Sequence, residues 1–298
     1  MPGSLVDIGD TKLYVDRRGD GLPVIVLHGG PGLDHHMFGD ALDPLSESCR
    51  LLLVDQRAQG RSERSDPATW TLAQMAADVS ALARALELER YAVLGHSFGA
   101  MVALQHAVSF SGQPAATIVS SGVASERQLL SHVHAELERF EPLDLRETVR
   151  RSWEREQSAQ TPEEVLELLR DQLPFHFADS RDPRIDDMRE GLAAGVYSPD
   201  VLRHFAAHGY GGIDVEAELP AVRHPVLVLA GRRDRTCSVE AAETIAGGIP
   251  GAELVVFERS AHMAFAEEQP AYVRSVAAFL GHHGLIFAED AGSSVNRP

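Results

Sequence analysis

Short runs of apolar residues recur along the chain, and most of them are apolar throughout rather than alternating with polar residues. Strands that are buried on both faces of a parallel sheet have this pattern. An earlier and less apolar segment also has the residue types of a strand. We therefore predict strands at Lys12–Val15, Pro23–His28, Arg50–Val54, Arg90–Leu94, Ala116–Val119, Pro225–Ala230 and Glu253–Phe257.

Segments with helical periodicity lie between these strands. From residue 72 to residue 88, apolar side chains recur at a spacing close to the roughly 3.6 residues of a helical turn. Further helices are predicted at Ala100–Val108, Val239–Ile245 and Ala271–Leu280. Strands that alternate with helices in this way predict an α/β fold with a doubly wound, mostly parallel sheet and right-handed crossovers.

The alternation stops after the fifth predicted strand and resumes before the sixth. The intervening stretch holds charged helical segments at Glu126–Phe140, Leu145–Gln157 and Pro162–Leu173, then a glycine-rich return loop at 204–212. We interpret this stretch as a helical cap inserted between core strands. The small polar residues at the end of the chain are typical of a disordered tail. The expected organisation is core at 1–121, cap at 122–219, core at 220–284 and tail at 285–298.

The composition excludes several classes of protein. The chain has 298 residues with a net charge of −17, which argues against nucleic acid or an anionic membrane as a partner. Its two cysteines, Cys49 and Cys237, make no disulfide framework. The N-terminus lacks a signal-peptide pattern, and no run approaches the roughly 18–20 apolar residues of a membrane helix. We expect a cytoplasmic protein with no membrane partner, and the sequence leaves its oligomeric state open.

The strongest chemical signal is the stretch Gly95-His96-Ser97-Phe98-Gly99, which reads Gly-x-Ser-x-Gly. A strand-like run precedes it and a helix-like run follows it. This strand–turn–helix context is the one that a nucleophile elbow requires. The turn projects the serine above the sheet, and the start of the following helix adds partial positive charge where an oxyanion forms. Ser97 is the predicted nucleophile.

A serine nucleophile needs a base, and the base needs an acid that orients it. In this architecture the chain order is Ser, then Asp or Glu, then His. Asp234 follows the predicted strand at 225–230, and His262 follows the predicted strand at 253–257. Both lie past the carboxyl ends of strands, where open α/β sheets bind ligands. We therefore predict the triad Ser97, Asp234 and His262, with Glu258 as a less suitable rival acid.

A second signal is His28-Gly29-Gly30-Pro31-Gly32, directly after a buried strand. An oxyanion needs two backbone N–H donors that converge on one point. One comes from the residue after the nucleophile, here Phe98, and the other from a glycine-rich loop of this kind. We predict Gly30 as the second donor and keep Gly29 as the alternative. His28 is interpreted as structural, holding the loop by hydrogen bonds.

Metal and cofactor signals are weak. Asp34 stands beside His35 and His36, but consecutive residues rarely ligate one ion together. The sequence has no glycine-rich phosphate loop and no dinucleotide fingerprint. We predict neither a metal nor a cofactor.

These motifs together resemble the α/β-hydrolase superfamily along nearly the whole chain. Within it the closest similarity is to the proline iminopeptidase-like group, of the S33 peptidase type. That group carries His-Gly-Gly-Pro-Gly and Asp-Gln-Arg-Gly-x-Gly-Arg-Ser. The present sequence has the first of these at 28–32 and Asp55-Gln56-Arg57-Ala58-Gln59-Gly60-Arg61-Ser62 for the second. We interpret Asp55, Gln56 and Arg57 as braces of the loops, since buried charged groups must pair internally.

The resemblance also implies substrate-binding residues in the cap. Members of the group bind the free α-amine of the substrate with carboxylates, one of which belongs to a Trp-Glu pair. Trp153-Glu154 is similar to that pair, so Trp153 and Glu154 are the substrate-binding candidates. The sequence departs from the group at the elbow, which usually reads Gly-Gly-Ser-Trp-Gly. It also has no acid where the second carboxylate of the group stands.

The sequence therefore predicts a serine hydrolase that cleaves a small ester, lactone or amide through an acyl-enzyme. A proline iminopeptidase-type aminopeptidase that releases an N-terminal residue is the first alternative. A ligand-binding protein on a hydrolase scaffold is the second. The expected partner is a small molecule or a short peptide.

Overall fold

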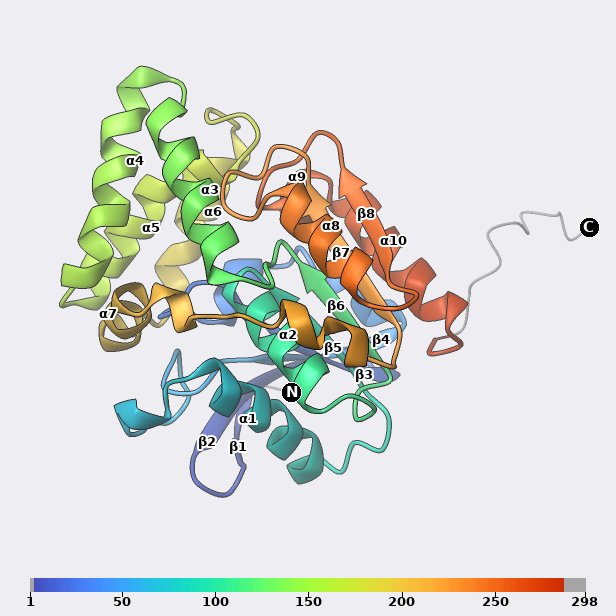
Figure 1. Cartoon of the computed structure of the whole chain (residues 1–298). Coiled ribbons are helices and arrows are strands. Elements are labelled where there is room, and N and C mark those ends of the chain that lie inside the picture. The colour runs from blue at the N-terminus through green and yellow to red at the C-terminus, as the bar shows by residue number, and fades with distance from the viewer. Residues whose placement is uncertain (1–2, 287–298) are drawn as a thin grey trace, which may run out of the picture.

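The computed structural model describes residues 3–286, and its centre is one eight-stranded sheet (Figure 1). The strands lie in the order β1-β2-β4-β3-β5-β6-β7-β8. The pairs β1–β2 and β2–β4 are antiparallel and the others are parallel, which confirms the predicted mostly parallel α/β sheet. The strands span Ser4–Asp7 (β1), Lys12–Arg18 (β2), Leu22–Leu27 (β3), Cys49–Val54 (β4), Ala92–His96 (β5), Ala116–Ser120 (β6), Val226–Gly231 (β7) and Glu253–Phe257 (β8).

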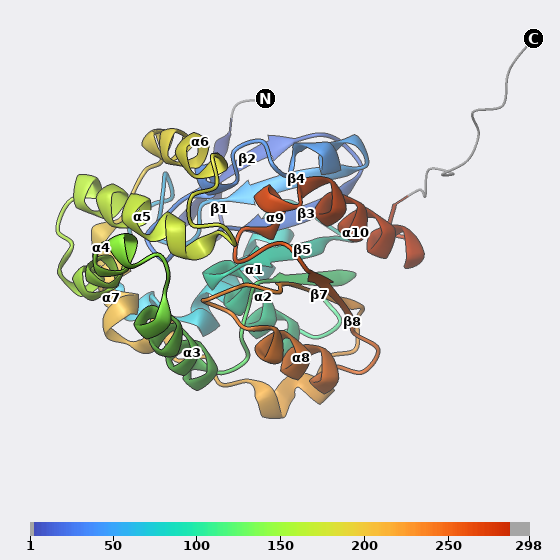
Figure 2. The ribbon, with the colours of Figure 1, turned by 90° about the horizontal axis from the view of Figure 1, so that it is seen from above.

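The continuous apolar runs are explained by helices on both faces of the sheet (Figure 2). In β3, Ile25 and Leu27 pack into the cluster that holds the helices at 72–85 (α1), 98–109 (α2) and 239–248 (α8), while Val24 and Val26 face the cluster that holds the helix at 269–282 (α10). Successive side chains of a strand point to opposite faces, so both sets must be apolar. The strand β1 was not predicted because its residues are mostly exposed and carry no apolar run.

The core helices begin where the sequence supplies caps. The Thr71 side chain accepts from the backbone N–H of Gln74 at the start of α1, and the Ser238 side chain caps α8 in the same way. The helices span Leu72–Ala85 (α1), Phe98–Ser109 (α2), Val239–Gly248 (α8), Ala264–Glu267 (α9) and Gln269–His282 (α10). The predicted core helices are present, with ends shifted by a few residues.

A helical region is inserted between β6 and β7, the position expected for the cap (Figure 1). Its helices span Glu126–Arg139 (α3), Leu143–Arg155 (α4), Pro162–His176 (α5), Arg184–Gly191 (α6) and Pro199–Ala207 (α7). The return loop predicted at 204–212 is wrong in its first part, because residues 204–207 complete α7. The apolar side chains of that helix, Val201, Leu202 and Phe205, are buried and stabilise it.

The disordered tail predicted at 285–298 falls almost entirely on residues 287–298, which lie outside the described part of the chain. Among residues 3–286, no helix combines the length and the apolar character needed to cross a membrane.

Candidate active site

Ser97 lies at the turn between β5 and α2 in a conformation that L-residues rarely adopt, with φ 56° and ψ −117°. Such a conformation costs on the order of 1–3 kcal/mol and persists only where the surroundings enforce it. The flanking glycines allow the close packing. A Cβ on Gly95 would lie 2.1 Å from the carbonyl oxygen of Gly99, and one on Gly99 would lie 2.3 Å from that of Leu27. The sequence therefore folds into the predicted elbow.

The structure brings the three predicted triad residues together. His262 Nε2 lies 2.9 Å from Ser97 Oγ, and His262 Nδ1 lies 2.8 Å from Asp234 Oδ2. The other oxygen of that carboxylate, Oδ1, accepts from the backbone N–H groups of Thr236 at 2.7 Å and Cys237 at 2.9 Å. Both oxygens of Asp234 are thus occupied, which holds the carboxylate in one orientation toward the imidazole.

The electrostatics of the site favour an ionised Asp234. Burial alone would raise the pKa of this carboxyl, but the charge of His262 and the hydrogen bonds lower it below its ordinary value. Two further histidines flank His262, with ring centroids 4.9 Å away for His96 and 5.0 Å away for His176. Burial lowers the pKa of His176 to about 3 and that of His96 well below its ordinary value, so both are neutral and add no charge.

The two predicted oxyanion donors lie at the pocket that contains Ser97. Within the described residues, neither the N–H of Gly30 nor that of Phe98 donates to a protein acceptor. The N–H of Gly29 is 2.9 Å from Met37 Sδ, which favours Gly30 over Gly29 as the donor. Gly30 has φ 91°, a conformation that suits glycine. The assignment of Gly30 and Phe98 stays a prediction that this geometry permits.

Buried polar residues brace the loop before the oxyanion donors. Gln56 donates from Nε2 to the carbonyl oxygen of His28 at 2.9 Å, and its backbone N–H faces His28 Nε2 at 3.2 Å. Gln59 Oε1 accepts from the N–H of Gly32 at 2.7 Å. Burial lowers the pKa of His28, so it is a neutral acceptor. These contacts agree with the structural role expected for His28 and Gln56.

The charged members of the same motif are paired inside the protein. Arg57 donates from Nε and Nη2 to both carboxylate oxygens of Asp78, at 2.7 and 2.6 Å. Asp55 accepts from His35 Nδ1 at 2.5 Å. Arg57 and Asp55 each have a partner inside the protein, so neither of these buried charged groups is left to pair with the reacting residues.

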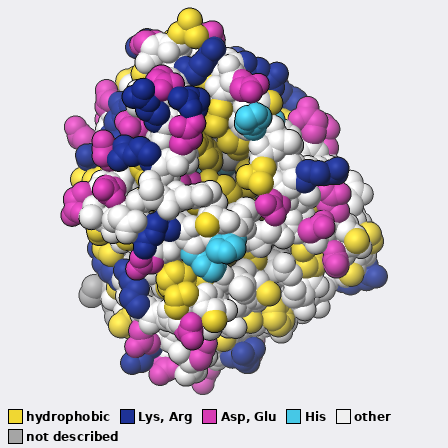
Figure 3. Space-filling view, turned by 60° about the vertical axis from the view of Figure 1, so that its left-hand side comes forward, with side chains coloured by type: hydrophobic (Ala, Val, Ile, Leu, Met, Phe, Trp, Pro, Cys, Tyr) yellow, Lys and Arg dark blue, Asp and Glu magenta, His cyan; other side chains and the backbone are white. Residues whose placement is uncertain are grey.

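A mostly apolar pocket connects these groups to the cap. Figure 3 shows, on the face that carries the cap, charged side chains of both signs around a hollow with hydrophobic side chains at its bottom. The pocket encloses a cavity of about 100 Å³. Its apolar lining comes from core and cap alike: Pro31, Leu33, Met37, Met101, Leu129, Trp153, Leu168, Leu169, Leu173, Met188, Leu192, Leu202 and Met263.

The structure separates the two predicted substrate-binding residues. Trp153 lines the pocket, but Glu154 does not: its side chain is exposed and pairs with Arg150 on the surface of α4. The prediction for Glu154 is therefore wrong. Neighbouring residues of a helix point in directions about 100° apart, so Trp153, which is half-buried and lines the pocket, leaves the next side chain pointing outward.

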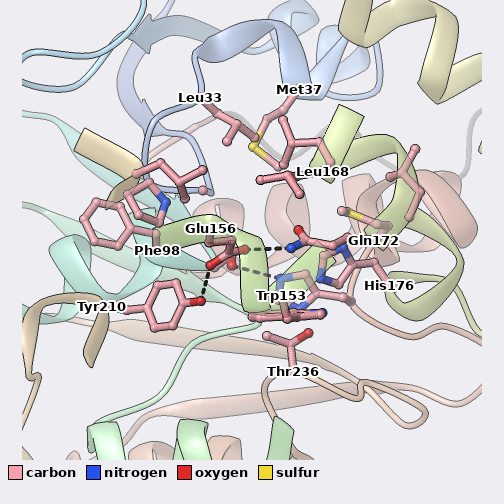
Figure 4. Close-up of a pocket in the computed structure, with 18 of the residues that line it drawn as sticks. Leu33, Met37, Phe98, Trp153, Glu156, Leu168, Gln172, His176, Tyr210 and Thr236 are labelled. Carbon is pink, nitrogen blue, oxygen red and sulfur yellow. Dashed lines mark hydrogen bonds between the residues drawn. The ribbon is translucent and has the colours of Figure 1, made fainter. Parts of the chain in front are cut away.

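The carboxylate that does reach the pocket belongs to Glu156. It lies in the short turn that follows α4, is 5% exposed, and accepts from Gln172 Nε2 at 2.7 Å and from the hydroxyl of Tyr210 (Figure 4). Burial raises its pKa to about 7, against the opposing effect of these hydrogen bonds. Glu156 was not among the residues predicted from the sequence. Its spacing of three residues from Trp153, on the same helical face, was the available signal.

The residues Asp34, His35 and His36, considered for a metal, do lie with candidate ligand atoms close together. Their side chains already have partners, however. His36 Nδ1 is 2.9 Å from Asp34 Oδ2, and Arg61 Nη1 lies 3.6 Å from the same oxygen. A guanidinium at this place competes with a cation, so the cluster carries no metal assignment.

Residues 23–269 match the family described as alpha/beta hydrolase fold. A proline iminopeptidase from Heyndrickxia coagulans is 28% identical over 274 residues, which cover 89% of this chain and 92% of the relative. A solved proline iminopeptidase from Mycobacterium smegmatis has a TM-score of 0.74 at 24% identity, covering 95% of this chain and 99% of that one.

An esterase from Exiguobacterium antarcticum has a TM-score of 0.72 at 21% identity, covering 93% of this chain and 99% of its own. At such identities the solved structures show a shared fold and leave the substrate open.

Proposed function

The chain belongs to the alpha/beta hydrolase fold family, and on that premise we propose that it is a serine hydrolase that cleaves a small ester, lactone or amide. The resemblance predicted from the sequence is confirmed by the family match and by the distant relatives named proline iminopeptidase. The observation that carries the proposal is the continuous hydrogen-bonded chain from Ser97 through His262 to Asp234.

In the first step Ser97 Oγ attacks the carbonyl carbon of the substrate while His262 Nε2 takes the hydroxyl proton. The carbonyl oxygen becomes an oxyanion, which accepts from the N–H groups of Gly30 and Phe98. The ionised Asp234 stabilises the imidazolium of His262. The tetrahedral intermediate then expels the alcohol or amine, to which His262 gives its proton, and the acyl group stays on Ser97.

In the second step a water molecule attacks the acyl-enzyme and gives one proton to His262. The second tetrahedral intermediate collapses, the proton returns to Ser97 Oγ, and the carboxylic acid leaves. The cycle needs no group beyond the substrate, water and these residues, and it ends with the site as it began.

The pocket supports a small and largely apolar substrate. Its cavity of about 100 Å³ is smaller than the roughly 150 Å³ that holds a benzene molecule in a protein core. A space of this size favours a short acyl chain over a bulky group. The esterase structure at 21% identity is consistent with ester chemistry on the same fold.

Aminopeptidase activity is the second candidate, and Glu156 is the observation that favours it. The carboxyl group of Glu156 is buried in the same pocket as Ser97, where an ammonium group of a substrate finds opposite charge. The relatives named proline iminopeptidase point the same way. This activity ranks second because the group uses two carboxylates and the described lining of the pocket holds one, Glu156 in place of the predicted Glu154.

The first experiment compares the wild type with Ser97→Ala on p-nitrophenyl butanoate and on proline p-nitroanilide at pH 7.5. We expect the wild type to hydrolyse at least one substrate, and kcat to fall by about 10⁴-fold or more in the variant. A fluorophosphonate probe should add one adduct at Ser97 by mass spectrometry. Turnover that survives in Ser97→Ala, with no adduct, would sink the proposal.

The second experiment separates the two substrate classes. Glu156→Gln should lower kcat/KM for proline p-nitroanilide by about tenfold or more and should affect p-nitrophenyl butanoate much less. Glu154→Gln is the matched control, since that side chain is exposed two residues away and should leave both rates within twofold. Equal effects of Glu156→Gln on both substrates would argue against an ammonium-binding role.

A further inference from the structure

Two polar atoms in the lining of the pocket have no hydrogen-bond partner among the residues that the structure describes. They are Nε1 of Trp153, from the cap helix α4, and Oγ1 of Thr236, from the loop that carries Asp234. Both atoms are buried, and Thr236 as a whole is 6% exposed. Other buried atoms without a partner belong to residues outside this pocket. Figure 4 draws both side chains in the pocket close-up, together with His176.

A buried donor without an acceptor is costly, and folded proteins rarely leave one in place. The chain has only two tryptophans, and the other one, Trp70, donates from Nε1 to Ser65 Oγ at 3.1 Å. The backbone N–H of Thr236 donates to Asp234, but the hydroxyl of Thr236 makes no hydrogen bond to that carboxylate. Two polar groups without hydrogen-bond partners line the same pocket as Ser97 and His262. This arrangement indicates that an atom of the ligand forms the missing hydrogen bonds.

The chemistry of the two groups defines that atom. An indole N–H only donates, so the ligand must present an acceptor to Trp153. The hydroxyl of Thr236 can donate to the same kind of atom. No lysine or arginine lines the pocket within the described chain, and Glu156 does. An anionic group such as a carboxylate would therefore meet repulsion, which leaves a neutral oxygen.

We propose that the substrate carries, besides the carbonyl that is cleaved, a second neutral oxygen acceptor that binds Trp153 Nε1–H and Thr236 Oγ1–H. A keto group in an ester and the carbonyl of a second residue in a peptide both have this chemistry. The inference rests on the proposed hydrolase function for the scissile carbonyl. It adds a specificity-determining subsite that joins the cap to the loop of Asp234.

Kinetics test the subsite with matched esters. Methyl 4-oxopentanoate is compared with methyl 4-methylpentanoate, and acetonyl butanoate with isobutyl butanoate, so that each pair exchanges a carbonyl for a branched carbon of similar size. For at least one pair, the wild type should favour the oxo ester by about fivefold to tenfold in kcat/KM. Trp153→Phe and Thr236→Val should each bring that ratio close to one.

Thr11→Val is the control variant. Thr11 Oγ1 is also buried without a partner among the described residues, but Thr11 does not line the pocket. This variant likewise removes a buried threonine hydroxyl that has no partner among the described residues, and it should leave the substrate ratio unchanged. A ratio near one in the wild type for both pairs would overturn the proposal, as would a ratio that Thr11→Val lowers as much as Thr236→Val does.

An NMR measurement tests the subsite without turnover. In Ser97→Ala labelled with ¹⁵N-tryptophan, the spectrum should show two indole N–H signals, which Trp153→Phe assigns. Adding an oxo ester should shift the Trp153 signal downfield and leave that of Trp70 in place, while the matched alkyl ester should produce no downfield shift. Equal shifts from both esters, or none, would refute the subsite. Failure of the hydrolase proposal would instead appear as absent Ser97-dependent turnover with the indole shift retained.

Discussion

Asp234 is a residue whose single side chain connects several parts of the site. One oxygen faces His262 and the other accepts two backbone N–H groups, so the imidazole has one orientation and one tautomer. The amide of an asparagine would fill the same space, but it can present an N–H where the carboxylate accepts. An asparagine at position 234 therefore tests the hydrogen bond to His262 while it keeps the packing of the side chain.

We expect Asp234→Asn to lower kcat on p-nitrophenyl butanoate by about 10³- to 10⁴-fold, because His262 loses the acceptor that orients it. Circular dichroism should show an unchanged fold. Glu258→Gln serves as the control, since Glu258 is an exposed carboxylate on the same sheet edge that pairs with Arg232. If kcat of Asp234→Asn fell by less than tenfold, a group other than Asp234 would have to orient His262.

Glu156 makes stability depend on pH in a defined direction. Its pKa is about 7 in the folded protein and near 4.5 in an unfolded chain, because burial opposes ionisation. The folded state therefore holds a proton that the unfolded state has lost. Stability from this group is fully present below pH 4.5 and is lost as the pH rises through 7.

Urea unfolding at pH 5 and pH 8 checks this dependence. Between these values the wild type should lose roughly 2 kcal/mol of unfolding free energy relative to Glu156→Gln, which carries no titrating group there. Parallel losses in the two proteins would show that Glu156 does not titrate in this range. Glu154→Gln should follow the wild type.

At the scale of elements, the unit formed by β5 and α2 places the nucleophile. Its first turn packs so closely against the end of β3 that a side chain on Gly99 has no room. The nearest atoms are backbone carbonyl oxygens of Leu27 and His28, which cannot rotate away. The same backbone leads directly into the loop that holds Gly30.

Gly99→Ala should therefore lower the free energy of unfolding by on the order of 3 kcal/mol and should also reduce kcat, because the backbone before the oxyanion loop has to move. Gly247→Ala is the matched control within α8, where an added Cβ meets no atom within 4 Å. It should be neutral or stabilise by up to about 1 kcal/mol. Thermal melts measure the stability of both variants. An unchanged melting temperature for Gly99→Ala would contradict the predicted steric clash.

At the scale of the whole molecule, the cap is fastened to the loops that carry the reacting residues. His262 donates its backbone N–H to the carbonyl oxygen of His176 in the cap at 3.0 Å. Arg235, next to Asp234, donates to the carbonyl oxygens of Phe175 at 3.1 Å and Phe177 at 2.7 Å. The position of the cap and the geometry of the site are therefore coupled.

Arg235→Met should lower the melting temperature by a few degrees and reduce kcat/KM several-fold, since two buried carbonyl groups lose their donor. Arg233→Met is the control, because Arg233 lies two residues earlier in the same loop with its side chain exposed. Calorimetry and ester kinetics measure both effects. Retention of wild-type stability and activity by Arg235→Met would show that the cap is held by other contacts.

The core and the reacting residues were predictable because their signals are local. Strands buried on both faces must be apolar throughout, and a parallel sheet aligns the carboxyl ends of its strands at one edge. The positions of Ser97, Asp234 and His262 after such strands were therefore enough to expect them together, and the structure brings them within hydrogen-bonding distance. The exposed β1, which lacks that pattern, escaped prediction.

The contents of the pocket were decided by tertiary structure alone. Helical spacing places Trp153 and Glu156 on one face, but which face of α4 turns toward the pocket depends on how the cap packs, and no local pattern contains that information. The unused hydroxyl of Thr236 becomes visible only when its surroundings are known. Catalytic order along the chain follows from the topology of the fold, whereas substrate recognition follows from side-chain directions that long-range packing determines.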